Sequence, residues 1–387
     1  MSLGLQIRTV TLSVLSGICF LTACGGGDSS EPTTSMQPDA IADTSLPEAT
    51  GADADSDTGV DADSDASSDL YWPSLDEWET STPEEAGVHI DKLNQAIGFA
   101  ESSNSGGLII VYEGRIVTER YWQGWDQNTT MTLNSATKSM TSMMAGMGLD
   151  DGSFDSLDQP ITDFAPQWID TPKDAITLEH FLTMTTGLST TPPTADEQTT
   201  NQFEALADGL TLDHTPGTYW EYNTPAYLML FTLIEKATGE TLEEYARRKL
   251  FEPLGMSSVE WVKVVVNEDV TNYRRIESNT RDMARFGLFT LRRGVWNNQQ
   301  LVSEDYFNKA TTPYLASKSD YGFLYWLREI NTPEGTETIR ANSALGLGHK
   351  IIMAIPSLNL VIVRHGDAAS GGFVTQLAEL IVAAFSD

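Results

Sequence analysis

Ser135 and Lys138 are the residues of this sequence whose types and spacing best suit nucleophilic catalysis. They stand three positions apart at the start of an apolar run of helical period, so a helix beginning near Ser135 would place the hydroxyl and the amine on one face. A serine hydroxyl becomes a good nucleophile when a neighbouring base accepts its proton, and a partly buried lysine amine can be that base. The positive end of such a helix would stabilise an oxyanion. The pair therefore predicts acyl transfer to Ser135.

The same pair also has a simpler interpretation. Ser-x-x-Lys is a short motif that chance supplies about once or twice in a chain of this length. A helix N-cap serine followed by an exposed lysine would give the same pattern without any chemistry. The methionines that follow have helical spacing and predict core packing: Met140, Met143, Met144 and Met147. Only partners elsewhere in the chain can decide between the two interpretations.

Residues 1–23 have the features of an export signal. Arg8 precedes an apolar run from Thr9 to Leu21, which is too short to span a bilayer as a stable helix. The segment ends in Leu-Thr-Ala followed by Cys24, which matches the bacterial lipobox, whose cysteine becomes the lipidated first residue. An ordinary signal peptide with an incidental cysteine is the alternative. We expect a protein exported to the bacterial cell envelope and anchored by Cys24 to the outer membrane or periplasmic face.

Residues 24–70 predict a disordered acidic linker behind that cysteine. Positions 25–69 contain twelve Asp or Glu residues and no Lys or Arg. Such a segment cannot bury enough apolar surface to offset its ordering entropy. Its aspartates do not fit a calcium loop, because Thr58 and Ser64 stand where a glycine and the closing glutamate are required. The only other cysteine, Cys19, lies in the signal, so no internal disulfide is expected.

Residues 71–387 have a globular composition that is still strongly acidic. Of the 55 acidic and 23 basic residues of the chain, twelve acids lie in the linker and one base in the signal. That excess argues against nucleic acid as a partner. The pattern does not predict an oligomeric state.

Periodicity divides this domain into strands at both ends and helices between them. We expect helices over 83–100 and 373–385, and strands over 108–112, 116–121, 338–343, 347–354 and 358–365. Between about 150 and 300 the pattern predicts a mainly helical lobe. The expected fold class is α/β, of the α+β kind: an antiparallel sheet built from the N- and C-terminal strands and flanked by helices, with the helical lobe inserted.

Six short motifs occur in an order and spacing that resemble the serine β-lactamase-related hydrolases. This group includes class C β-lactamases, D-alanyl carboxypeptidases, family VIII-type esterases and nylon-oligomer hydrolases. The motifs are 78–87 (WETSTPEEAG), 135–139 (SATKS), 178–187 (LEHFLTMTTG), 216–224 (PGTYWEYNT), 280–287 (TRDMARFG) and 346–348 (GLG). The resemblance covers the domain from about Trp78 to the C-terminus and implies a β-lactamase/transpeptidase-like fold.

The resemblance implies roles for three side chains. Ser135 would be the acylated nucleophile and Lys138 its base partner. Tyr222 matches the tyrosine of the family's Tyr-x-Asn motif and would relay a proton to the leaving group. We favour Lys138 over Tyr222 as the initial base. No metal or cofactor is implied.

The resemblance also places a substrate-binding strand late in the chain. Gly346, Leu347 and Gly348 stand where the family has Lys-Thr-Gly or His-x-Gly on the strand at the edge of the site. The backbone N–H groups of Ser135 and His349 would then form the oxyanion hole. A strand beside a helix N-terminus can supply such a pair of donors, and glycine lets a substrate approach the backbone closely.

Two departures from the family pattern narrow the expected substrate. Gly346 replaces the basic residue that holds the substrate carboxylate in β-lactamases and penicillin-binding proteins, which disfavours substrates with a fixed anionic group. Thr224 replaces the asparagine of Tyr-x-Asn. It would lie at the substrate, or act as the N-cap of a helix beginning at Pro225. Lys350 could restore a cation on the same face of the strand.

Other candidate residues favour a structural role. Residues 197–201 mimic the Glu-x-x-x-Asn motif of class A β-lactamases, but they precede Tyr222, which is the wrong order. The five histidines have no metal-ligand spacing, and His180 is expected to pack within its motif. The aromatic residues 321–326 and Trp220 could form the wall of an acyl pocket, or pack on the sheet.

The sequence thus predicts a serine hydrolase that cleaves an ester or amide, with an esterase or a nylon-oligomer-like amidase preferred. Its substrate would be a small-molecule ester or amide, or a short peptide. The nearer alternative is a D-amino-acid carboxypeptidase or β-lactamase that acts on cell-wall peptides or β-lactams. The alternative of another class is a sensor lipoprotein that binds or is acylated by its ligand without turnover.

Overall fold

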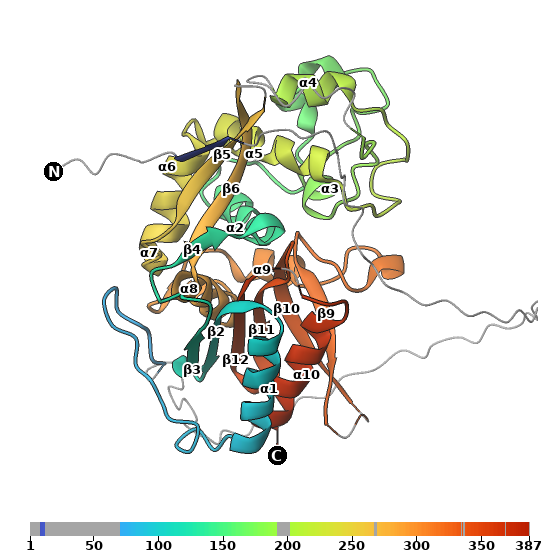
Figure 1. Ribbon diagram of the computed structural model, residues 1–387. Helices are drawn as coiled ribbons and strands as arrows, with labels where there is room; N and C mark the ends of the chain where they lie inside the picture. The colour runs from blue at the N-terminus through green and yellow to red at the C-terminus, as the bar shows by residue number, and fades with distance from the viewer. Residues whose placement is uncertain are drawn as a thin grey trace, which may run out of the picture. The chain divides into compact units, whose positions relative to one another are not determined.

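The computed structural model describes residues 8–11, 70–191, 202–266, 269–333, 335, 337–367 and 369–386 (Figure 1). Cys24 and all of the predicted linker except Leu70 lie outside the described residues, as do positions 197–201. None of the described helices is long and apolar enough to cross a membrane.

A six-stranded antiparallel sheet joins the two ends of the domain. Its strand order is β3-β2-β12-β11-β10-β9, and β12 pairs with β2, so that strands from both ends of the domain lie side by side. The strands are β2 (Ser105–Tyr112), β3 (Arg115–Tyr121), β9 (Trp326–Asn331), β10 (Thr338–Gly346), β11 (Lys350–Ile355) and β12 (Leu360–Gly366). The predicted sheet of N- and C-terminal strands is confirmed, with β9 as a strand that the prediction missed.

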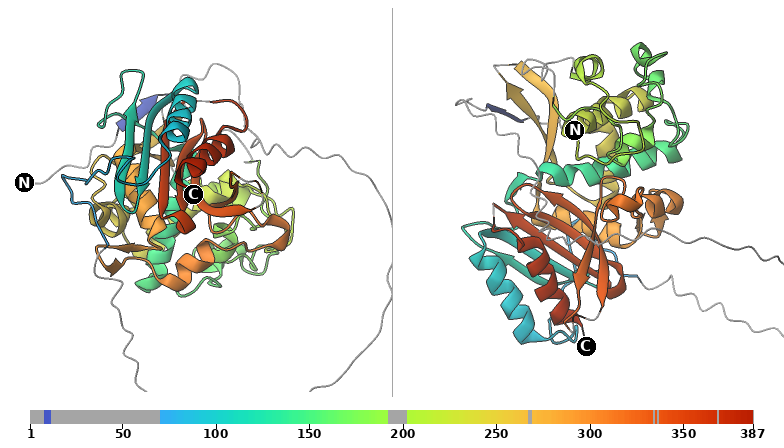
Figure 2. Two further views of the ribbon diagram at one scale, coloured as in Figure 1. Left: turned by 90° about the horizontal axis from the view of Figure 1, so that it is seen from below. Right: turned by 90° about the vertical axis from the view of Figure 1, so that its right-hand side faces the viewer.

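The sheet is buried on both faces because helices cover each of them. α1 (Ile90–Ser102) and α10 (Phe373–Phe385) pack together on one face (Figure 2), against alternate strand residues such as Ile110 and Met353. α8 (Thr280–Leu291) packs on the other face. Gly287 lets α8 approach closely, because a Cβ there would lie 2.4 Å from Val361. This double burial explains the continuous apolar runs of β11 and β12.

The first predicted helix begins later than its sequence suggested, whereas the last one has the predicted bounds. Residues 83–87 form a turn, not the start of α1. The amide of Thr82 donates to the carboxylate of Glu85 over 2.9 Å, and the amide of Glu85 donates to the Thr82 hydroxyl over 3.2 Å. Gly87 then adopts a φ of +68°, which ends this single turn before α1 begins.

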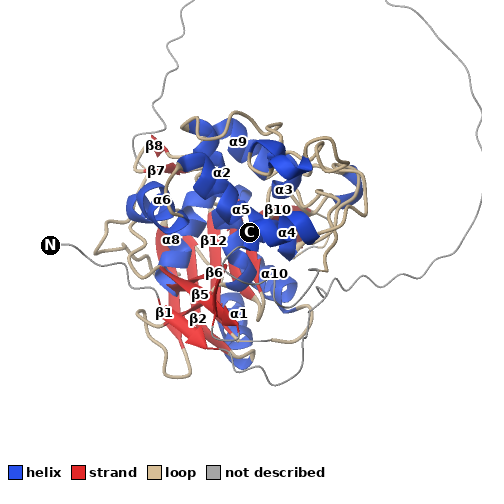
Figure 3. Ribbon diagram, turned by 90° about the horizontal axis from the view of Figure 1, so that it is seen from above, coloured by secondary structure: helices blue, strands red, loops and turns tan. Residues whose placement is uncertain are grey.

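The region between about 150 and 300 is mainly helical, as predicted, but it contains strands. Figures 1 and 3 show its helices close together beside α2. Besides α8, the helices of this part of the chain and its borders are α2 (Thr137–Asp150), α3 (Leu178–Leu182), α4 (Gln202–Gly209), α5 (Thr224–Thr238), α6 (Leu242–Ala246), α7 (Glu252–Leu254) and α9 (Glu304–Ala310). Short helical turns lie at Asn134–Ala136 (η1), Ile161–Asp163, Pro166–Trp168, Arg247–Phe251, Ala316–Lys318 and Pro356–Leu358.

A second sheet, which the sequence did not predict, runs past the start of α2. It has the order β1-β5-β6-β4, where the long β5–β6 hairpin pairs with the short β4 that leads into η1. Its strands are β1 (Arg8–Thr11), β4 (Thr130–Thr132), β5 (Glu260–Val266) and β6 (Asp269–Asn279); β7 (Val295–Trp296) and β8 (Gln299–Gln300) form a separate hairpin. Cleavage of the predicted signal would remove β1.

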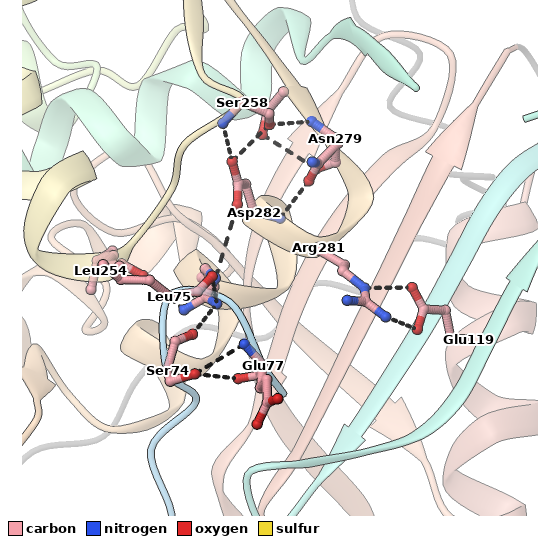
Figure 4. Close-up of polar contacts among 11 residues, drawn as sticks. Ser74, Leu75, Glu77, Glu119, Leu254, Ser258, Asn279, Arg281 and Asp282 are labelled. Carbon is pink, nitrogen blue, oxygen red and sulfur yellow. Dashed lines mark hydrogen bonds and ion pairs between the residues drawn. The ribbon is translucent and has the colours of Figure 1, made fainter. Parts of the chain in front are cut away.

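The 280–287 motif anchors the first turn of α8 (Figure 4). Asn279 caps the helix by accepting from the amide of Asp282 over 2.8 Å, and Asp282 in turn accepts from the amide and hydroxyl of Ser258. Arg281 makes two bonds of 2.8 Å to Glu119 on β3. Burial would raise the pKa of Glu119, but the bonds from Arg281 and Tyr121 hold that pKa below its ordinary value. This motif is therefore structural, and it fixes α8 between the two sheets.

Candidate active site

Ser135 and Lys138 lie together where β4 turns into α2. Ser135 occupies the 3-10 turn η1 and Lys138 the first turn of α2, so the helix proper begins two residues after the serine. The Nζ atom of Lys138 lies 3.5 Å from the Oγ atom of Ser135. The lysine is only 5% exposed, which argues against the simpler interpretation of an N-cap serine beside an exposed lysine. The four methionines that follow are buried in the core, as predicted.

Two aromatic rings surround the Lys138 amine. Its Nζ lies 4.2 Å from the centre of the Tyr227 ring and 5.1 Å from that of Tyr222. Among the described residues, no carboxylate forms an ion pair with Lys138. Sequence reasoning missed Tyr227, because its position in the apolar stripe of α5 indicates only core packing. Its hydroxyl lies 2.9 Å from that of Thr141, one turn beyond Lys138.

Tyr222 lies beside Lys138 and is held by the residue that follows it. Asn223, which is buried, caps α5 by accepting from the amide of Ala226 and donates to the carbonyls of Leu188 and Ser189. The prediction that Thr224 is the N-cap is therefore wrong: Thr224 is the first residue of α5, half-buried, and does not line the cavity described below. An asparagine amide can accept one hydrogen bond and donate two at the same time, whereas a threonine hydroxyl has a single hydrogen to donate. The Tyr222 hydroxyl makes no hydrogen bond with any described residue.

The late motif approaches Ser135 through a turn and not through a strand. β10 ends at Gly346 and β11 begins at Lys350, so the predicted strand over 347–354 begins too early. Gly348 and His349 have φ values of +82° and +60°, which only a turn accommodates. The side-chain amide of Asn134, the residue before Ser135, donates to the Leu347 carbonyl over 3.1 Å. This bond joins the turn that contains His349 directly to η1.

Gly346 has no room for a side chain. A Cβ at this position would lie 2.1 Å from the carbonyl oxygen of Leu133, two residues before Ser135. The basic residue of the related hydrolases is therefore sterically excluded here. Lys350, the cross-strand partner of Gly346, is buried and does not line the cavity in front of Ser135. Burial lowers the Lys350 pKa from its usual value.

Gly346→Ala is expected to lower the free energy of unfolding by about 2 kcal/mol, because the methyl group overpacks a backbone contact. Urea denaturation would measure the change, and ester hydrolysis should fall with it because Leu133 leads into η1. Gly98→Ala is the matched control. Gly98 is an exposed residue of α1, and a methyl group there would meet nothing within 4 Å, so its replacement should leave stability unchanged or raise it. Equal stability of both variants would contradict the steric account.

The side chain of Arg364 donates hydrogen bonds to the turn at 348–349, and sequence reasoning missed this residue. This fully buried residue of β12 donates to the carbonyls of Gly348 over 2.7 Å and His349 over 3.2 Å. It also donates to the Ser105 hydroxyl and to the carbonyls of residues 103, 104 and 367. Burial lowers its pKa to about 10. A single arginine within an otherwise apolar strand (LVIVRHG) is the signal that could have revealed it.

A cavity of about 120 Å³ opens in front of Ser135. Its lining residues come from η1, α2, α5, β6 and the late turn: Asn134, Ser135, Thr137, Lys138, Tyr227, Arg274, Arg275 and Leu347. Leu347 is 60% exposed at its edge. Within the described residues, no group of histidine, cysteine, aspartate and glutamate could hold a metal ion. His180 instead makes a capping bond with Thr177, as a packing role predicts.

Aromatic residues extend the site on the far side of Tyr222. The Tyr222 ring stacks on Trp326 at 6.0 Å, and both contact Trp220 and Tyr321 at ring separations of 4.9 to 6.5 Å. Lys318 lies 4.2 Å above the Trp220 ring. The predicted aromatic wall is thus in contact with Tyr222, and the same rings pack on one another.

Comparisons with known proteins agree with this architecture. The Beta-lactamase family model matches residues 90–371. An uncharacterized protein of Alkalihalophilus pseudofirmus is 23% identical over 320 residues, which cover 72% of this chain and 87% of that protein. The structure of a proposed 6-aminohexanoate-dimer hydrolase from Bacillus anthracis superposes with a TM-score of 0.62 at 16% identity, covering 79% of this chain and 87% of that one. The crystal structure of a family VIII carboxylesterase superposes with a TM-score of 0.61 at 14% identity, covering 76% of this chain and 96% of the esterase chain.

Proposed function

Because this chain belongs to the beta-lactamase family, we propose that it cleaves an ester or amide bond through an acyl-Ser135 intermediate. The observation that carries the proposal is the position of the buried Lys138 amine, 3.5 Å from the Ser135 hydroxyl at the opening of a cavity. Such a distance lies within reach of a base that will move slightly when substrate binds. The carboxylates of the described residues form no ion pair with this amine.

The proposed reaction begins when the Lys138 amine accepts the Ser135 proton as Oγ attacks the substrate carbonyl. The carbonyl oxygen then becomes an oxyanion, for which the N–H groups of Ser135 and His349 are the proposed donors. The Asn134–Leu347 bond supports this assignment because it holds the two backbone segments together. The new Lys138 ammonium lies over the rings of Tyr227 and Tyr222, which stabilise a cation.

Collapse of the tetrahedral intermediate then breaks the bond to the leaving group, which takes a proton from Lys138 through the Tyr222 hydroxyl. That hydroxyl has no hydrogen-bond partner among the described residues, so it is free to bind the leaving group. Water subsequently attacks the acyl-Ser135 ester by the same steps in reverse, which returns the serine. The steps require no group beyond these side chains, backbone donors and one water.

An esterase or a nylon-oligomer-like amidase is the preferred assignment. The relatives named above include a carboxylesterase and a proposed hydrolase of an aminohexanoate dimer, and position 346 carries no cation. Leu347 and Gly348 are the proposed substrate contacts beside Gly346. The aromatic residues beside Tyr222 would accept an apolar part of the substrate.

A panel of substrates tests the assignment. The full chain, purified in detergent, would be mixed with 4-nitrophenyl butyrate, the matching 4-nitroanilide, a chromogenic cephalosporin and a D-Ala-D-Ala peptide. We expect repeated turnover of the ester, with slower cleavage of the anilide, because an amide is the less reactive acyl donor. Faster turnover of the cephalosporin than of the ester would overturn the preference. A burst equal to the protein concentration, without turnover, would instead identify a ligand-binding sensor.

A further inference from the structure

A lysine ammonium lies against the aromatic residues beside Tyr222. Four rings are close together there, with centres 4.9 to 6.5 Å apart, and we call them the aromatic box: Trp220, Tyr222, Tyr321 and Trp326. The Nζ atom of Lys318 lies 4.2 Å from the centre of the Trp220 ring and 5.4 Å from that of Trp326. The negative face of an aromatic ring attracts a cation, and tryptophan attracts it most strongly. The box thus already binds an ammonium group, one that belongs to the chain itself.

An acidic residue completes the surroundings of this ammonium. The Lys318 Nζ lies 2.9 Å from a carboxylate oxygen of Asp320. The Asp320 backbone is fixed beside the box, because its carbonyl accepts from the amide of Leu327 on β9 over 2.8 Å. Two ring faces and a carboxylate together suit a cation. The acidic excess of the whole chain, 55 acidic against 23 basic residues, adds to the attraction for a positively charged ligand.

Lys318 is a weakly held occupant of this site. It ends the short helical turn Ala316–Lys318, its neighbours Ser317 and Ser319 are exposed, and its own side chain is 24% exposed. A cation–π contact and an ion pair are both weak at such a position, because water competes for the charged groups. The ammonium group of a ligand can therefore take the place of the Lys318 ammonium without any rearrangement of the rings.

The aromatic box lies next to the groups of the proposed chemistry. Tyr222 stacks on Trp326 at 6.0 Å, and the Nζ atom of Lys138 lies 5.1 Å from the centre of the Tyr222 ring. In the proposed reaction the Tyr222 hydroxyl acts on the leaving group. A substrate cation that enters the box therefore belongs most simply to the leaving group.

Resting on the proposed function, we propose that the aromatic box and Asp320 bind an alkylammonium group on the leaving group of the substrate, and that Lys318 occupies this site until the substrate replaces it. Lys318 then turns towards solvent, since two ammonium groups repel each other at close range. The structure of the late motif agrees with this charge. Position 346 has no room for a basic side chain, and a substrate whose fixed charge is positive needs none.

Two pairs of butyrate esters that differ in charge but not in shape test the proposal on the full chain in a nonionic detergent. The alcohol is choline or 3,3-dimethylbutanol in the first pair, and 6-(trimethylammonio)hexanol or 7,7-dimethyloctanol in the second. Lys318→Met should raise kcat/KM for the cationic member of at least one pair about 3- to 30-fold, because the resident ammonium no longer competes. The neutral member should change by less than about twofold. Adding Asp320→Asn to Lys318→Met should remove most of the gain.

Lys236→Met is the matched control. Lys236 also lies 4.2 Å from the centre of an aromatic ring, that of Phe203, and pairs with Glu204. It belongs to the last turn of α5, about 18 Å along the helix from Thr224. Its replacement removes the same charge from the chain and should leave both members of each pair unchanged. The absence of a gain in Lys318→Met, an equal gain for its neutral ester, or an equal gain in Lys236→Met would overturn the proposal.

A binding measurement separates this proposal from the proposed function. In calorimetry, n-butyltrimethylammonium should bind the Lys318→Met chain about 3- to 30-fold more tightly than the unmodified chain. If no ester is hydrolysed but this difference is found, the proposed function fails and the cation site stands. If esters are hydrolysed and the ammonium compound binds both proteins equally, the cation site fails and the hydrolase stands.

Discussion

Replacing Ser135 with alanine is expected to lower kcat/KM for 4-nitrophenyl butyrate by about 10⁴-fold or more, to a rate set by background hydrolysis. Without Oγ no acyl-enzyme can form, and the Lys138 amine has no proton to accept. The measurement is the release of 4-nitrophenol, together with mass spectrometry of protein mixed with ester. Wild-type protein should gain the mass of one acyl group, and the variant should gain none.

Ser102→Ala serves as the control for this loss, because Ser102 is an exposed residue near the end of α1. It should retain full activity.

Lys138→Met should approach the Ser135→Ala rate, since it removes the amine 3.5 Å from Oγ. Tyr222→Phe should lose less, because its hydroxyl acts only on the leaving group in this scheme. Retention of the acyl mass in Ser135→Ala would place the nucleophile elsewhere.

Arg364→Leu is expected to lower the free energy of unfolding by about 3 kcal/mol or more, because it leaves buried acceptors without donors. The acceptors are the carbonyls of residues 103, 104, 348, 349 and 367 and the hydroxyl of Ser105. Urea denaturation followed by tryptophan fluorescence would measure the loss. Without urea, at a temperature where the variant stays folded, kcat should also fall, since two of these carbonyls belong to the turn beside Ser135.

The exposed Arg293 provides a comparison. Arg293→Leu removes a surface ion pair with Glu304 and should change stability by less than about 1 kcal/mol. A small effect of Arg364→Leu, similar to that of Arg293→Leu, would show that solvent or other donors satisfy the turn and that Arg364 does not support it.

Local patterns in the sequence predict the proximity of Ser135 and Lys138 and most of the sheet. Ser135 and Lys138 are one helical turn apart, so their proximity depends on a few backbone dihedrals. The central strands and α10 follow from apolar periodicity over short windows. Periodicity places the start of the first helix too early because residues 83–87 have a helical pattern. In the structure they form a separate turn, which is closed by the bonds between Thr82 and Glu85 and ended by the positive φ of Gly87.

The remaining features of the site depend on contacts that no local pattern encodes. The predicted helical region contains β5 and β6, and β6 pairs with β4, which lies more than 100 positions earlier in the chain. Arg275 cannot be assigned to the cavity without that pairing. Gly346 is recognisable as a departure from the family pattern, but the reason for it, the Leu133 carbonyl, lies in a distant segment. Arg364 and Tyr227 likewise act through partners far away in the sequence.

The bonds made by Arg364 have a consequence for the order in which the protein matures. Its guanidinium joins the start of β2, which is synthesised early, to the turn at 348–349, which is synthesised late. Ser135 and Lys138 leave the ribosome long before this late strand does. The turn that completes their site is fixed only after the last central strand has paired with the first. A chain that is still being made, or that crosses a membrane unfolded, therefore carries Ser135 and Lys138 without the turn that lies beside them in the folded protein.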